Sequence, residues 1–157
     1  MTAAVAADNE LVLTTIAAPT VPATARAMLR MRLETWRIAA TPGGRDRVFE
    51  MELCASELVT NACQAAPDSR ITFKVIREPR AVWIGVWDSS YEDPVPSCVV
   101  ALDVEDITPD IHALAADHVA DDIGGWGLPL VIGLTTEREI IRTYAPSGKW
   151  VCCKYYL

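Results

Sequence analysis

The sequence lacks several features that identify whole classes of protein. Its 14 Lys and Arg are outnumbered by 21 Asp and Glu, giving a net charge of −7. This balance excludes a broad basic surface for nucleic acid or an anionic membrane. The chain has an odd number of cysteines and no Cys-x-x-Cys pair, which argues against a disulfide framework or a zinc site. We interpret the five as buried free thiols: Cys54, Cys63, Cys98, Cys152 and Cys153.

The N-terminal region lacks the pattern of an export signal or a membrane span. The first ten residues, MTAAVAADNE, hold two acidic residues and no basic one, whereas a secretory signal begins with positive charge. The uncharged stretch 11–25 is interrupted by Pro19 and Pro22, and it is shorter than the ~20 apolar residues that cross a bilayer. We therefore expect a cytoplasmic protein.

The length and composition favour one compact domain. A chain of 157 residues with 51% hydrophobic residues is long enough to bury a full core. We assign residues 1–10 to a flexible tail and 11–157 to a single domain. A β-branched strand is expected at 11–17, followed by a helix from Pro22 to about Ile38. The apolar positions of that helix include Ala27, Met28, Met31 and Trp36.

The second helix has the clearest pattern in the sequence. Its apolar residues recur in steps of three and four: Val48, Met51, Ala55, Leu58, Val59, Ala62 and Ala66. Strands are expected at 71–77 and 81–87, a long connection at 88–122, a short helix from Leu128, and two further strands at 139–145 and 150–157. This order predicts an α+β fold in which the helices lie on one face of a sheet.

Two polar side chains interrupt the second helix one turn apart. Glu57 and Asn61 are four residues apart, which places them about 40° apart at 100° per residue. They border the apolar stripe, where a carboxylate and a carboxamide could hold a divalent cation or orient a nucleophile. The alternative is that both face solvent at the edge of the stripe, and the spacing by itself favours that alternative.

Two further positions allow both a chemical and a structural interpretation. Asp88 ends an apolar strand, where it could accept a hydrogen bond from an exocyclic amine or simply form a turn. Gly124, Gly125 and Gly127 precede a helix, where they could approach a phosphate or form an ordinary turn. Neither glycine-rich nucleotide fingerprint is present.

In combination, these motifs resemble the GHKL ATPase and kinase superfamily. The segments ELVTNACQAAP, VWDSSYEDPVP and GGWGLPLVIGL follow one another in the order and spacing of that superfamily. They are most similar to the small anti-sigma-factor serine/threonine kinases and their actinobacterial ATP-binding relatives. The likeness extends from about Leu11 to Leu157.

The resemblance implies a fold and a ligand. It implies a two-layer α/β sandwich, the Bergerat fold, with a mixed and mostly antiparallel sheet, and ATP with Mg²⁺ bound between the layers under a lid at about 97–124. Glu57 matches the general base, Asn61 the magnesium ligand, and Asp88 the acceptor for the adenine amine. The phosphate-contacting turn corresponds to Gly124, Gly125, Trp126, Gly127 and Leu128.

The chain departs from this family pattern in three respects. Asp88 is followed by Ser89-Ser90, where the family often has Asp-x-Gly, and Trp126 stands where relatives often have Arg. No Lys or Arg occurs between Arg80 and Arg138. We therefore predict weaker ATP binding than in relatives with a basic lid. His112 and His118 are interpreted as polar surface, with a metal site as the alternative.

Two functions follow from the resemblance. The first is an ATP-dependent serine/threonine protein kinase that phosphorylates an anti-sigma antagonist and binds a sigma factor, and the family likeness implies a homodimer. The second is a regulatory module that is weak or inactive in catalysis and holds a partner with ATP as a structural ligand, or without nucleotide. A detached histidine-kinase catalytic domain is a third and weaker interpretation.

Overall fold

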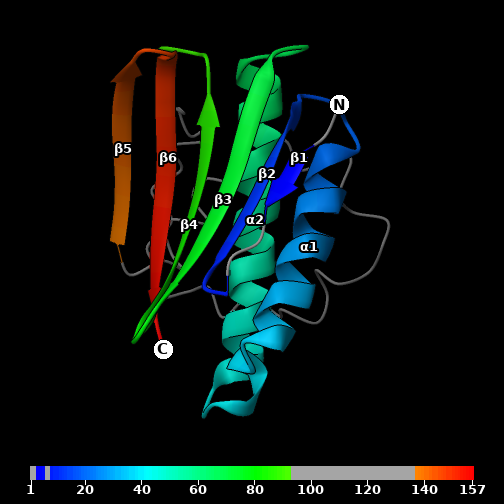
Figure 1. Cartoon of the computed structure of the whole chain (residues 1–157), viewed down its shortest axis with the longest axis vertical. Helices are drawn as coiled ribbons and strands as arrows, with labels where there is room; N and C mark the ends of the chain where they lie inside the picture. Colours follow the sequence, from blue (N-terminus) through cyan, green and yellow to red (C-terminus); the bar gives the residue numbers. More distant parts are fainter. Residues whose placement is uncertain (1–2, 6–7, 93–136) are drawn as a thin grey trace, which may run out of the picture.

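The computed structural model of the chain describes residues 3–5, 8–92 and 137–157. In chain order its elements are β1 (Ala3–Val5), β2 (Glu10–Ile16), α1 (Val21–Thr35), the 3-10 helix η1 (Ile38–Ala40), α2 (Gly44–Ala65), β3 (Arg70–Glu78), β4 (Ala81–Asp88), β5 (Glu137–Tyr144) and β6 (Ser147–Tyr156). Figure 1 shows α1 and α2 side by side against one face of a twisted sheet. None of the described helices is long and apolar enough to cross a membrane.

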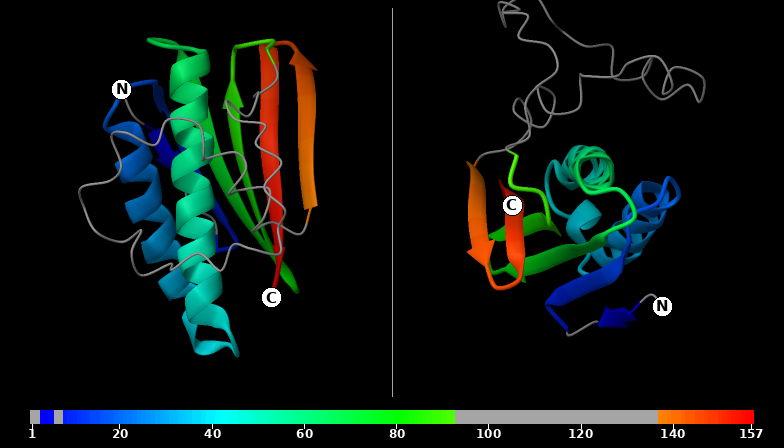
Figure 2. Two further views of the ribbon diagram at one scale, coloured as in Figure 1. Left: turned by 180° about the vertical axis from the view of Figure 1, so that it is seen from behind. Right: turned by 90° about the horizontal axis from the view of Figure 1, so that it is seen from above.

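Within the described residues, six strands form one sheet in the order β1-β2-β3-β4-β6-β5. Each neighbouring pair is antiparallel. The predicted α+β sandwich with its helices on one face is confirmed, and Figure 2 shows the two layers from above. The resemblance implies a mixed, mostly antiparallel sheet, whereas the strands that the structure describes form no parallel pair. The strand order places β6, the last strand in the sequence, in the interior of the sheet beside β4.

Two boundaries differ from those that the sequence predicts. The segment Ala3–Val5, which falls within the predicted tail, pairs with β2 as β1, because the edge of β2 offers unpaired backbone groups. The second helix begins at Gly44, four residues before the first residue of its apolar stripe. Gly43 precedes it with φ +70°, a left-handed conformation that glycine adopts without strain.

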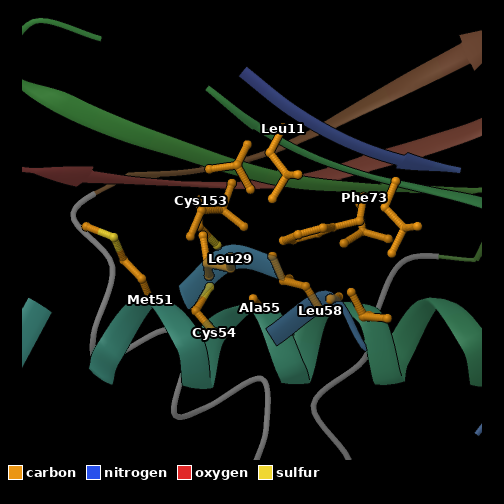
Figure 3. Packing of buried hydrophobic residues seen from close by; sticks show 14 of the residues in the cluster. Leu11, Leu29, Met51, Cys54, Ala55, Leu58, Phe73 and Cys153 are labelled. Carbon is orange, nitrogen blue, oxygen red and sulfur yellow. The ribbon is translucent and has the colours of Figure 1, made fainter. Parts of the chain in front are cut away.

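The core lies between α1, α2 and the inner face of the sheet. Alternate strand residues such as Phe73 and Ile84 pack against the stripe of α2 that includes Ala55 and Leu58, as Figure 3 shows for several of them. The stripe predicted for α2 is largely confirmed, since Met51, Ala55, Leu58, Val59, Ala62 and Ala66 are buried.

The apolar positions expected in α1 are partly buried: Trp36 belongs to the core and Met28 packs against it. Leu29 and Leu33 are buried, whereas Met31 is 60% exposed. A short helix rich in Ala, Met and Leu carries apolar residues on more than one side, so its periodicity does not fix which side is buried.

Three of the described cysteines are buried in the sheet or against it. Cys54 faces Cys153 across the layers (Figure 3), and the pKa of Cys54 is raised by its hydrogen bond with Cys153 and by burial. Cys152 is on the opposite face of β6, where burial raises its pKa to about 12. All described cysteines are free, so the predicted buried free thiols are confirmed, except Cys63, which is half-buried, and Cys98, which lies outside the described residues.

These thiols should react slowly in the native protein. At pH 8, a thiol with a pKa of about 12 has a thiolate fraction about a thousandfold below that of a thiol with the ordinary value of 9.0. In a Cys98→Ser variant, Ellman's reagent should label Cys54, Cys152 and Cys153 only after unfolding in urea, and Cys63 should react first. Rapid labelling of all four thiols without urea would contradict the packing of α2 on β6.

Candidate functional site

Asp88 occupies the C-terminal end of β4, on the inner face of the sheet. It shares this face with Val82, Ile84 and Val86, which belong to the core. The residue is 2% exposed. Its Oδ1 accepts a hydrogen bond from the backbone N–H of Ser90 at 2.8 Å. Asp88 is therefore both the end of a buried strand and an anchor for the turn that follows, as the sequence predicts for a turn-forming acid.

The direct partner of Asp88 is a residue that sequence reasoning missed. Lys149 on β6 is paired with Asp88 in the strand register, and its Nζ donates to Asp88 Oδ1 at 2.8 Å and to the carbonyl of Ser90 at 3.3 Å. The side chains of Lys149 and Asp88 are 2% and 3% exposed. Gly148 allows this approach, because a Cβ at that position would lie 2.2 Å from the Asp88 carbonyl oxygen.

A signal for Lys149 is present in the sequence. Lys149 alternates with Val151, Cys153 and Tyr155, so it falls on the apolar face of its strand. A lysine on such a face must find an acidic partner, because an isolated buried ammonium is very costly. The sequence does not reveal that partner, since the pairing of β6 with β4 joins residues 61 positions apart.

The contact between α2 and β6 fixes which ends of the two layers lie together. The hydroxyl of Tyr155 donates to the backbone carbonyl of Glu50 at 3.3 Å. From there the two elements run in opposite directions (Figure 1). From Glu50 to Asn61 the helix advances about 16 Å, and from Tyr155 back to Lys149 the strand covers about 20 Å. Asn61 therefore lies at the same end of the layers as Lys149 and its partner Asp88.

Asn61 has an unused hydrogen-bonding group. Its Nδ2 is buried and has no hydrogen-bond partner among the residues that the structure describes, which is costly unless a ligand satisfies the amide. The two ends of a carboxamide are similar in shape, so either Oδ1 or Nδ2 can occupy this position. The residues that the structure describes contain no cluster of three or more His, Cys, Asp or Glu that could hold a metal ion. Asn61 could hold a magnesium ion whose remaining ligands would come from phosphate and water.

Glu57 lies one turn before Asn61 on α2 and is half-buried. Burial raises the pKa of its carboxyl group above the ordinary value of 4.5. A carboxylate with a raised pKa is a better general base near neutral pH than an exposed one. The structure therefore speaks against the interpretation in which Glu57 and Asn61 simply face solvent. Both side chains are half-buried and border the core.

The fold also brings a second basic residue to this end of the sheet. Arg142 on β5 is paired with Lys149 in the register, and its guanidinium donates to the backbone carbonyl of Tyr91 at 2.6 Å. The absence of Lys and Arg from 81–137 therefore does not leave the region without cations. The strength of ATP binding, predicted to be weak from that absence, remains a prediction.

Several predicted site residues lie outside the described residues. These are the turn residues Gly124, Gly125, Trp126, Gly127 and Leu128, the predicted lid at about 97–124, and both histidines. The structure thus brings Asp88 and Asn61 to one end of the sandwich, with Glu57 one turn away, and adds Lys149 and Arg142 to them.

Comparison with known proteins gives one match. A family model described as a histidine kinase-like ATPase domain matches residues 18–155. No curated protein matches the chain. The match covers all three motifs on which the resemblance depends, including the segment 124–128.

Proposed function

The chain belongs to the family of histidine kinase-like ATPase domains, and from this premise we propose that it is an ATP-binding regulatory protein that binds Mg·ATP between α2 and the sheet. One observation carries the proposal: the buried Nδ2 of Asn61, which has no hydrogen-bond partner among the described residues, lies at the same end of the layers as Asp88. Unsatisfied buried polar groups are rare in folded proteins, and a ligand is a common reason for them.

The nucleotide is held at its two ends. Asp88 Oδ2 would accept a hydrogen bond from the adenine amine, and Asn61 would hold the magnesium ion through its amide oxygen. The ion would supply charge neutralisation for the triphosphate. The resemblance implies that the backbone N–H groups of 124–128, which lie outside the described residues, would contact the phosphates.

The reaction that this site supports best is phosphotransfer to a serine or threonine hydroxyl. Glu57 accepts the hydroxyl proton as the serine oxygen forms its bond to the γ-phosphorus and the bond to the β,γ-bridging oxygen breaks, releasing ADP. The raised pKa of Glu57 supports this role. By resemblance, the substrate is an anti-sigma antagonist, the second partner a sigma factor, and the assembly a homodimer in the cytoplasm; all four remain predictions.

One observation favours the alternative, a partner-binding module with weak or no catalysis. Ser89-Ser90 replaces the family's Asp-x-Gly turn, so this turn lacks the glycine that lets a backbone approach a ligand closely. ATP is then a structural ligand, or no nucleotide binds.

Isothermal titration calorimetry with Mg·ATP tests the nucleotide site. Wild type should release or absorb heat with saturable binding, and Asn61→Ala should raise the Kd by about tenfold or more, because it removes the magnesium ligand. The matched control is Gln64→Ala, three residues further along α2 on its exposed side, which should bind as wild type does. Absence of binding in wild type would favour the module without nucleotide.

A further inference from the structure

The pairing of Asp88 with Lys149 is more than a structural contact. A buried ion pair contributes little net stability, and well-packed apolar residues at the two positions would serve the fold equally well. Yet both side chains are nearly fully buried at the end of the sandwich that also holds Asn61. An ion pair at this position therefore calls for a role beyond stability.

We propose that Lys149 is a positioning residue for the nucleotide base: it holds Asp88 by Oδ1, so that Oδ2 alone is presented to the exocyclic amine of a 6-aminopurine. This inference rests on the proposed ATP site. It assigns to Lys149 a role that neither the sequence motifs nor the family match assigns.

The hydrogen-bond inventory of the carboxylate supports this assignment. Each oxygen of an ionised carboxylate accepts about two hydrogen bonds. Oδ1 of Asp88 accepts two, from Lys149 and from the backbone of Ser90. Both of these hydrogen bonds go to Oδ1, and neither goes to Oδ2. Because Lys149 also donates to the Ser90 carbonyl, it ties the carboxylate to the turn and restricts its rotation.

An acceptor fixed in this way selects among purines. A carboxylate oxygen attracts the amine at position 6 of adenine and repels the carbonyl oxygen at position 6 of hypoxanthine. Hydrogen bonds to a charged group are among the stronger ones, so loss of this contact corresponds to about tenfold to a hundredfold in affinity. Wild type should therefore bind ATP more tightly than inosine triphosphate by that factor.

The experiment measures the Kd of ATP and of inosine triphosphate by calorimetry on wild type and on Lys149→Arg and Lys149→Met. The arginine variant keeps a cation and donors for Oδ1, and its preference for ATP should stay at about tenfold or more. The methionine variant releases the carboxylate, and its preference should fall to about threefold or less. The ratio of the two Kd values serves as its own control, because partial unfolding weakens the binding of both nucleotides alike.

The outcomes separate this inference from the proposed function. If neither nucleotide binds to wild type, the ATP site itself is wrong. If ATP binds but inosine triphosphate binds equally well, the proposed function stands and the base-positioning role is overturned. An unchanged preference in Lys149→Met also overturns it. Should Lys149→Met fail to fold, Lys149→Gln replaces it. If Lys149→Gln then prefers ATP as strongly as Lys149→Arg does, the charge of Lys149 has no role in positioning the base.

Discussion

Replacing Glu57 by glutamine is expected to lower the rate of phosphotransfer by about a hundredfold to ten thousandfold. Glutamine has nearly the same shape as glutamate but does not accept the proton of the attacking hydroxyl. Its effect should fall on kcat, and the Kd of Mg·ATP should stay within about threefold, because Asp88 and Asn61 are unchanged. The measurement is transfer of labelled γ-phosphate to a candidate antagonist protein, alongside calorimetry of the variant.

The pH profile gives an independent check on Glu57. Because burial raises its pKa above 4.5, the base is protonated over a wider acidic range than an exposed glutamate. The phosphotransfer rate of wild type should therefore fall as the pH falls through that raised pKa. The rate of Glu57→Gln should show no such fall over the same pH range. The control is Glu50→Gln on the same helix, whose carboxyl pKa is also raised by burial and whose replacement should leave the rate within about threefold. If Glu57→Gln and Glu50→Gln lower the rate equally, the loss comes from a disturbed helix and not from removal of a general base.

Replacing Lys149 by methionine is expected to lower the free energy of unfolding by about 3–5 kcal/mol. The change leaves the carboxylate of Asp88 buried without its direct partner, and this unpaired charge costs more than the lost contact itself. The measurement is urea denaturation followed by tryptophan fluorescence, which reports on Trp87 and Trp150 in the two strands that carry the pair.

Two further variants identify the source of that loss. Lys154→Met removes a lysine from the same strand whose salt bridge with Glu78 is partly exposed, and it should lower the free energy of unfolding far less than Lys149→Met does. The double variant Lys149→Met with Asp88→Leu should recover most of the stability, because no buried charge remains. If Lys149→Met costs no more than Lys154→Met, the ion pair is not buried in solution.

Much of the fold could be predicted because its signals are local. The apolar stripe of α2 repeats with the helical period, and it is long enough to fix which face is buried. The strands at 71–77 and 81–87 show alternation and β-branched residues, and both occur close to the predicted bounds. The buried side of α1 was predicted less well, because its apolar residues lie all around the helix. Only contact with α2 and the sheet selects Leu29 and Leu33 over Met31.

The candidate site divides in the same way. Glu57 and Asn61 were found because helical spacing places them on one side of α2, and Asp88 because it ends an apolar strand. Lys149 and Arg142 were not found, because their importance comes from pairing between strands that are distant in the sequence. Local spacing carries no information about which strand becomes the neighbour of which.

The sequence by itself therefore determined the elements, their order and the polar residues that interrupt their apolar faces, since periodicity and turn chemistry act within a few residues. Only the tertiary structure decided that β6 lies between β4 and β5, and so that a lysine 61 residues away closes on Asp88. The physical reason is that strand order is set by burial of the whole sheet under α1 and α2, a property of the complete chain rather than of any segment.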